Sequence, residues 1–115
     1  MTFDPGLAQT LRDALADLSV TERKMFGGLC FLLGGHMVCG VHKGGAMVRV
    51  GKDNYAQALA LPGVAPMLFT GRPMAGMVDV SDAAAEDDAT LDRLLSMALQ
   101  TVRALPPKVA KASKR

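Results

Sequence analysis

Two cysteines and two histidines, residue types that bind metal ions and carry out nucleophilic reactions, lie close together in the chain as Cys30, His36, Cys39 and His42. A Cys2His2 zinc site needs all four side chains to converge on one ion at about 2.0–2.3 Å. A cysteine–histidine catalytic pair needs its two groups within hydrogen-bonding reach. Whether either arrangement forms depends on the strands that carry these residues.

Glycine pairs at 34–35 and 44–45 predict two-residue hairpin turns, because glycine accepts the positive φ angles that such turns require. Three antiparallel strands are therefore expected, over residues 25–33, 36–42 and 46–51. Side chains alternate between the two faces of a sheet, so this register puts both cysteines on one face and both histidines on the other. That separation argues against a zinc site and against a cysteine–histidine pair, and we expect no metal.

The same register places Cys30 directly opposite Cys39, which is compatible with a cross-strand disulfide. Two free, buried thiols are the favoured alternative, because the chain shows no export signal and cysteines stay reduced in the cytoplasm. A cytoplasmic protein is therefore expected. No apolar run approaches the roughly 20 residues that a membrane helix needs, so we expect no membrane partner.

The register also predicts two different sheet faces, with Val41 opposite Val48 in the second hairpin. We expect helices to cover the apolar face formed by Cys30, Leu32, Met37, Cys39, Val41, Ala46, Val48 and Val50. The other face is also mostly apolar, whereas a sheet covered on one side is usually polar on its second side. It is therefore predicted to be a homodimer interface or a ligand groove, unless a helix or loop covers it. Its candidate interface residues are Leu29, Phe31, Leu33, His36, Val38 and Met47, and it also carries His42 and Arg49.

The loop at residues 69–74 presents Arg72 between Gly71 and Pro73. A guanidinium held on a stiff turn suits a carboxylate or phosphate, so Arg72 and Arg49 are candidate anion-binding or partner-binding residues. An ion pair within the chain or a solvated turn is the alternative.

No motif for catalysis or for a cofactor is visible. Residues 45–52 resemble a phosphate-binding loop, but they have five residues between the glycines and Asp53 in place of the required Ser or Thr. The chain also lacks a dinucleotide-binding glycine pattern, a nucleophile elbow and a paired-carboxylate arrangement. We therefore predict a protein that is not an enzyme and needs no cofactor.

These residues must be positioned by a small α+β domain. Asp4-Pro5 predicts the start of a helix that ends near Ser19, and Asp53 that of a short helix to Leu61. Two further strands are expected at 67–69 and 77–80. An acidic stretch at 86–88 opens a last helix with an apolar stripe, which ends at Pro106. The predicted order is α-β-β-β-α-β-β-α, a two-layer sandwich with a five-stranded, mainly antiparallel sheet and helices on one face.

Short motifs in consistent order resemble the TfoX/Sxy N-terminal domain family: Met25-Phe26-Gly27-Gly28, Gly40-Val41, residues 47–51 and 69–76, and Leu105-Pro106-Pro107-Lys108. The similarity extends over roughly residues 5–108. It implies a small bacterial α+β domain related to regulators of DNA-uptake competence, which act with the transcription machinery. Those regulators have a second, helical domain, and we expect this chain to be a stand-alone member without it. The resemblance supplies no catalytic residues.

The net charge of +2 conceals an uneven distribution. Residues 106–115 form a predicted mobile tail that contains Lys108, Lys111, Lys114 and Arg115 and no acid, which leaves the predicted domain, residues 1–105, at −2. The tail favours weak, salt-dependent contact with nucleic acid. Three functions therefore stand: a regulatory module that binds protein as a homodimer, a nucleic-acid-associated protein using the tail, and a small-anion binder or undetected enzyme at Arg72 and Arg49.

Overall fold

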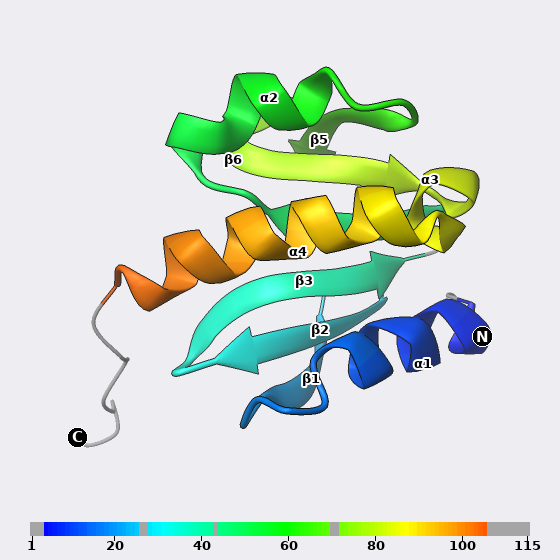
Figure 1. Cartoon of the computed structure of the whole chain (residues 1–115), viewed down its shortest axis with the longest axis vertical. Coiled ribbons are helices and arrows are strands. Elements are labelled where there is room, and N and C mark those ends of the chain that lie inside the picture. The colour runs from blue at the N-terminus through cyan, green and yellow to red at the C-terminus, as the bar shows by residue number, and fades with distance from the viewer. Residues whose placement is uncertain (1–3, 26–27, 43, 70–71, 106–115) are drawn as a thin grey trace.

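A computed structural model describes residues 4–25, 28–42, 44–69 and 72–105, which form one antiparallel sheet with helices on one of its faces (Figure 1). The sheet has six strands in the order β1-β2-β3-β4-β6-β5. The elements are α1 (Pro5–Ala14), β1 (Thr21–Met25), β2 (Gly28–Leu33), β3 (His36–His42), β4 (Gly45–Arg49), the 3-10 helix η1 (Lys52–Asn54), α2 (Tyr55–Leu59), β5 (Val64–Phe69), β6 (Arg72–Ser81), α3 (Asp82–Glu86) and α4 (Asp88–Arg103).

Capping residues mark the starts of the helices. The Asp4 carboxylate accepts a hydrogen bond from the backbone N–H of Gly6 at 2.8 Å, and Pro5 is the first residue of α1. Asp87 caps α4 by accepting the backbone N–H of Thr90 at 3.0 Å. Ser81 caps the short helix α3, which the sequence had not separated from α4. The predicted α+β class and the starts of the first and last helices are confirmed, whereas the first helix ends at Ala14 and not near Ser19.

The sheet has one strand more than predicted. Thr21–Met25 forms the edge strand β1 and pairs with β2, whereas the prediction had no strand before residue 25. This segment is largely charged, with the sequence Thr-Glu-Arg-Lys, so it lacks the alternation that marks a half-buried strand. Strands β5 and β6 are also longer than predicted, and Arg72 is the first residue of β6 instead of part of a loop.

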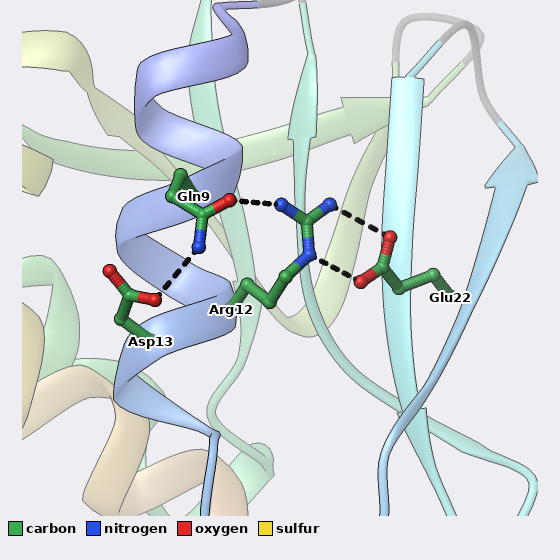
Figure 2. Close-up of polar contacts among 4 residues, drawn as sticks. All are labelled: Gln9, Arg12, Asp13 and Glu22. Carbon is green, nitrogen blue, oxygen red and sulfur yellow. Dashed lines mark hydrogen bonds and ion pairs between the residues drawn. The ribbon is translucent and has the colours of Figure 1, made fainter.

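The edge strand β1 is attached to the helix layer by the Arg12 side chain, which binds Glu22 through two nitrogens, Nη2 at 2.8 Å and Nε (Figure 2). Arg12 also donates to Gln9, whose amide donates to Asp13, so the guanidinium is oriented from α1. The hydrogen bond from Arg12 lowers the pKa of the Glu22 carboxyl below its ordinary value. This exposed ion pair joins residues ten positions apart and links α1 to the edge strand of the sheet.

A β-bulge decides which residues face the helices. Leu33 pairs with His36 and Leu32 with Met37, as predicted, but beyond the bulge Phe31 pairs with Cys39 and Cys30 with Gly40. The extra residue is Val38, and it shifts the register of the rest of the hairpin by one. The predicted pairing of Cys30 with Cys39 is therefore wrong.

The one-residue shift exchanges parts of the two predicted faces. The helix-covered face now includes Leu29, Phe31 and Val38, which are fully or almost fully buried in one core cluster with α1 and α4 residues such as Leu11 and Leu94. These three predicted interface residues are thus unavailable on an open surface. Leu33 also packs against this core. Conversely, Cys30, Leu32 and Met37 lie on the face without helices.

The second hairpin also differs from its prediction, because His42 pairs with Gly45, which the prediction had placed in the turn. Cys39, not Val41, lies opposite Val48. A shift of two residues leaves every side chain on its expected face, so Val41, Ala46 and Val48 remain in the helix-covered core as predicted.

Candidate functional site

The face of the sheet that carries no helix has its own apolar cluster, which we call the open-face cluster. Its members come from five strands: Cys30, Leu32, Met37, Met47, Met67 and Met77. Met47 is 1% exposed and Cys30 is fully buried, whereas Met37 and Met67 are partly exposed. Methionine packs adaptably and is enriched at protein interfaces. The cluster therefore offers a deformable apolar surface around Met37 and Met67.

Gly40 makes room for the centre of this cluster. A Cβ atom at residue 40 would lie 2.9 Å from the Met47 methyl carbon, 3.1 Å from the Cys30 sulfur and 2.8 Å from the Leu29 carbonyl oxygen. The Met47 methyl and the Cys30 sulfur thus come together over the bare backbone of β3. Any side chain at Gly40 would displace them.

The two thiols are free and lie on opposite faces of the sheet, Cys30 in the open-face cluster and Cys39 in the helix-covered core. Burial raises the pKa of Cys30 to about 11 and raises that of Cys39 as well. Both thiols are therefore protonated at neutral pH, and neither has the character of a nucleophile. The separation of the two faces also prevents the cross-strand disulfide that the predicted register allowed. Within the described ranges, no group of three or more His, Cys, Asp or Glu residues is placed to hold a metal ion.

A histidine–carboxylate pair lies at one end of the open face. His42 Nε2 is 2.6 Å from Asp79 Oδ1, and the backbone N–H of Gly44 donates to His42 Nδ1 at 3.0 Å. Because a backbone N–H can only donate, Nδ1 accepts and Nε2 carries the proton towards Asp79. Both ring nitrogens are engaged, so His42 has no free nitrogen with which to take a substrate proton in this arrangement. The pair crosses β4 at Gly45, which has no side chain to obstruct it.

Other polar residues border the open-face cluster. Arg23 lies opposite Cys30, Arg49 opposite Met77 and Asp79 opposite Met47, so all three side chains belong to the open face. The Asp79 side chain remains 43% exposed despite its bond to His42. The border therefore carries charges of both signs.

A pocket with a volume of about 660 Å³ lies at the end of β4, between the last turn of α4 and the chain that leads into α2. Arg49 lines it together with Gly51, Lys52 and Gly76. The backbone N–H of Gly51 donates to the Gly76 carbonyl at 3.0 Å, and both glycines have positive φ angles, 89° and 84°. This close approach of two backbone segments forms one wall of the pocket.

The predicted site residues are thus separated by the structure. Met47 lies in the open-face cluster, and Arg49 lies at its border, where it lines the pocket together with Met77. His36 is half-buried at the β2–β3 turn. Arg72 begins β6 opposite Phe69, at the far end of the strand from Ser81. Its anion-binding role stays a prediction. The tail cations Lys108, Lys111, Lys114 and Arg115 lie outside the described residues, and their contact with nucleic acid likewise stays a prediction.

Sequence reasoning missed Asp79 and the two pocket glycines, Gly51 and Gly76. Asp79 follows an apolar residue in a strand and could have been expected to point away from the core, but its partner His42 is 37 positions away. A glycine directly after an apolar strand residue, as Gly51 is after Val50, is typical of a turn. Nothing in the sequence, however, relates Gly51 to Gly76.

Fold and site together define a small α+β domain whose antiparallel sheet has helices on one face and a methionine-rich cluster on the other. Comparison with known protein families matches residues 13–102 to the TfoX N-terminal domain, and the chain belongs to this family. The resemblance found in the sequence motifs is confirmed. No curated protein and no solved structure matches the chain. Across the described ranges, every helix is too short or too polar to cross a membrane.

Proposed function

We propose that this protein is a regulatory module without catalytic chemistry, which acts by binding protein and forms a homodimer through the open-face cluster. Membership of the TfoX N-terminal domain family supports a role like that of the competence regulators, whose partners include the transcription machinery. The single observation that carries the proposal is the methionine-rich cluster on the face without helices.

The edges of the sheet favour association through its face. Strand β1 is one edge, and its residues Glu22, Arg23 and Lys24 are exposed and charged. Strand β5 is the other edge, and it contains the exposed Pro66, which has no N–H to donate. Charged residues and proline are the features that block pairing of a strand with another chain. A partner is therefore expected to cover the face rather than to extend the sheet.

The charges around the cluster favour a second copy of this chain as the partner. A twofold axis places the same patch against itself, so a patch with charges of both signs is self-complementary when opposite signs meet across the axis. Arg23 supplies positive charge on the open face, and the partly exposed Asp79 carboxylate supplies negative charge. The partly exposed Met37 and Met67 would form the apolar centre of the contact.

Sedimentation equilibrium of the full chain, from low to high micromolar concentration, tests the proposal. We expect a dimer for the native sequence and a monomer for Met67→Glu or Met37→Glu. A carboxylate buried without a partner costs several kcal/mol, and about 3 kcal/mol raises the dissociation constant more than 100-fold.

Gln57→Glu is the matched control, because Gln57 is exposed on α2 in the helix layer and takes the same new charge. This variant should dimerise like the native chain, and far-UV circular dichroism should show all three variants folded. A native chain that stays monomeric at high micromolar concentration would contradict the proposal, and so would folded methionine variants that still dimerise.

A further inference from the structure

The pocket at the end of β4 has the size and the composition of a small-molecule site. Its volume of about 660 Å³ lies within the usual range for ligand pockets, about 300–1,000 Å³. Its walls come from three parts of the chain that are distant in sequence: the segment from Arg49 to Asn54, Gly76 and Met77 on β6, and the last turn of α4. A site built from distant segments is held in shape by the fold rather than by one flexible loop.

Side chains that fix the shape of the pocket also determine which groups remain available to a ligand. Asn54 Nδ2 donates to the Val50 carbonyl at 2.9 Å and makes a long contact of 3.5 Å with Gln100 Oε1. Thr101 Oγ1 donates to the same carbonyl at 2.7 Å. The Gln100 amide oxygen faces Asn54, and this contact leaves the Gln100 nitrogen, a donor, for other partners.

The charge of the lining residues is positive. Arg49 is half-buried, and none of the carboxylates in the described part of the chain forms an ion pair with it. Lys52 adds a second cation, and Asp53 is the one acid among the lining residues. The C-terminal end of α4 also faces the pocket and contributes about half an elementary negative charge, which is less than the net charge of +1 that Arg49, Lys52 and Asp53 leave.

We propose that this pocket binds a small organic anion, a carboxylate or a phosphate monoester, with its acidic group on Arg49 and Lys52. Arg49 binds such a group through two parallel N–H donors, and the Gln100 amide donates a third hydrogen bond. The apolar body of the ligand packs on Met77 and Leu105, which line the same pocket. The ligand is thus expected to carry both an acid and an apolar part, and inorganic phosphate alone should bind more weakly.

Amide chemical shifts of the ¹⁵N-labelled full chain provide the test, with benzoate and phenyl phosphate as the two acidic probes. Benzyl alcohol is the neutral probe of similar shape, and inorganic phosphate is the acid without an apolar body. We expect saturable shifts at Gly51, Gly76 and Gln100 with one or both acidic probes and at least tenfold weaker binding of the other two. The stronger acidic probe distinguishes a carboxylate ligand from a phosphate ligand.

Two variants connect the binding to the pocket. Arg49→Gln keeps a polar side chain of moderate length but removes the charge, and it should raise the dissociation constant of the acidic probe at least tenfold. Ala104→Phe fills the pocket from an exposed position on the α4 end and should weaken binding similarly without changing any charge. Arg93→Gln removes an exposed charge from α4 outside the pocket and should leave binding unchanged.

The proposal is overturned if no acidic probe gives saturable shifts, if benzyl alcohol binds as well as the acids, or if the shifts map away from the pocket. Equal losses in Arg49→Gln and Arg93→Gln would also overturn it, because they would indicate a general charge effect. Dimerisation is measured separately, so a failure here leaves the proposed function standing.

Discussion

Replacing Phe31 tests the β-bulge that distinguishes the two faces of the sheet. Phe31 is fully buried in the helix-covered core, and Phe→Ala at such a site costs about 3–5 kcal/mol. Met37 lies in the same hairpin but on the open face and is only half-buried, so Met37→Ala should cost about 1–2 kcal/mol in the monomer. The register without a bulge predicts the reverse order, with Phe31 on the open face and Met37 under the helices.

Urea denaturation followed by far-UV circular dichroism measures both costs, since the chain has no Trp whose fluorescence could be used. The protein concentration should be low, because a dimer would add its own stability. A domain of this size has about 5–15 kcal/mol of stability in total. If Phe31→Ala does not fold, Phe31→Leu and Met37→Leu replace the two alanine variants, with expected losses of about 1 kcal/mol and close to zero. A smaller loss for Phe31→Ala than for Met37→Ala would refute the assignment of the faces.

Three other predictions concern the thiols, the pocket wall and the edge strand. Burial raises the pKa values of Cys30 and Cys39, so both thiols should react with a disulfide reagent at pH 8 slowly in the native protein and quickly in urea. Rapid labelling without denaturant would contradict their burial. Gly51→Ala should lower the free energy of unfolding by more than about 1 kcal/mol, because residue 51 has a φ of 89° and its Cβ would collide with Thr101 Oγ1 on α4; an unchanged free energy would contradict this geometry. The hydrogen bond from Arg12 lowers the pKa of Glu22 in the folded state, so its stabilising effect is present above the ordinary carboxyl pKa and is lost as the pH falls through the folded value. Glu22→Gln should therefore reduce the acid-induced loss of stability. A pH profile identical to that of the native chain would count against the pairing.

The sequence was sufficient for features that depend on local chemistry. Asp4-Pro5 and Asp87 mark the starts of α1 and α4 because a cap acts within its own turn. The Gly34-Gly35 turn was also predictable, since both residues have the positive φ angles of 61° and 84° that a two-residue hairpin turn uses. The family motifs covered most of the chain and were confirmed.

The sequence was insufficient where the choice depends on distant contacts. Strand β2 reads Gly-Leu-Cys-Phe-Leu-Leu, so no polar side chain indicates which face is covered, and a bulge at Val38 leaves no local signal. The charged strand β1 could not be recognised because Glu22 is stabilised by Arg12 on a helix. The sequence singled out Arg49 and Met47, but the pocket and the cluster that contain them are formed only by tertiary packing.

The most direct test of the proposed homodimer is to detect contacts between methionine methyl groups of two different copies. A mixed sample of ¹³C-methyl-methionine chains and unlabelled chains allows nuclear Overhauser effects between copies to be selected. We expect such effects at the methyl groups of Met37 and Met67, the partly exposed members of the open-face cluster. Effects confined to residues of the helix layer, or no effects between copies at millimolar concentration, would contradict it.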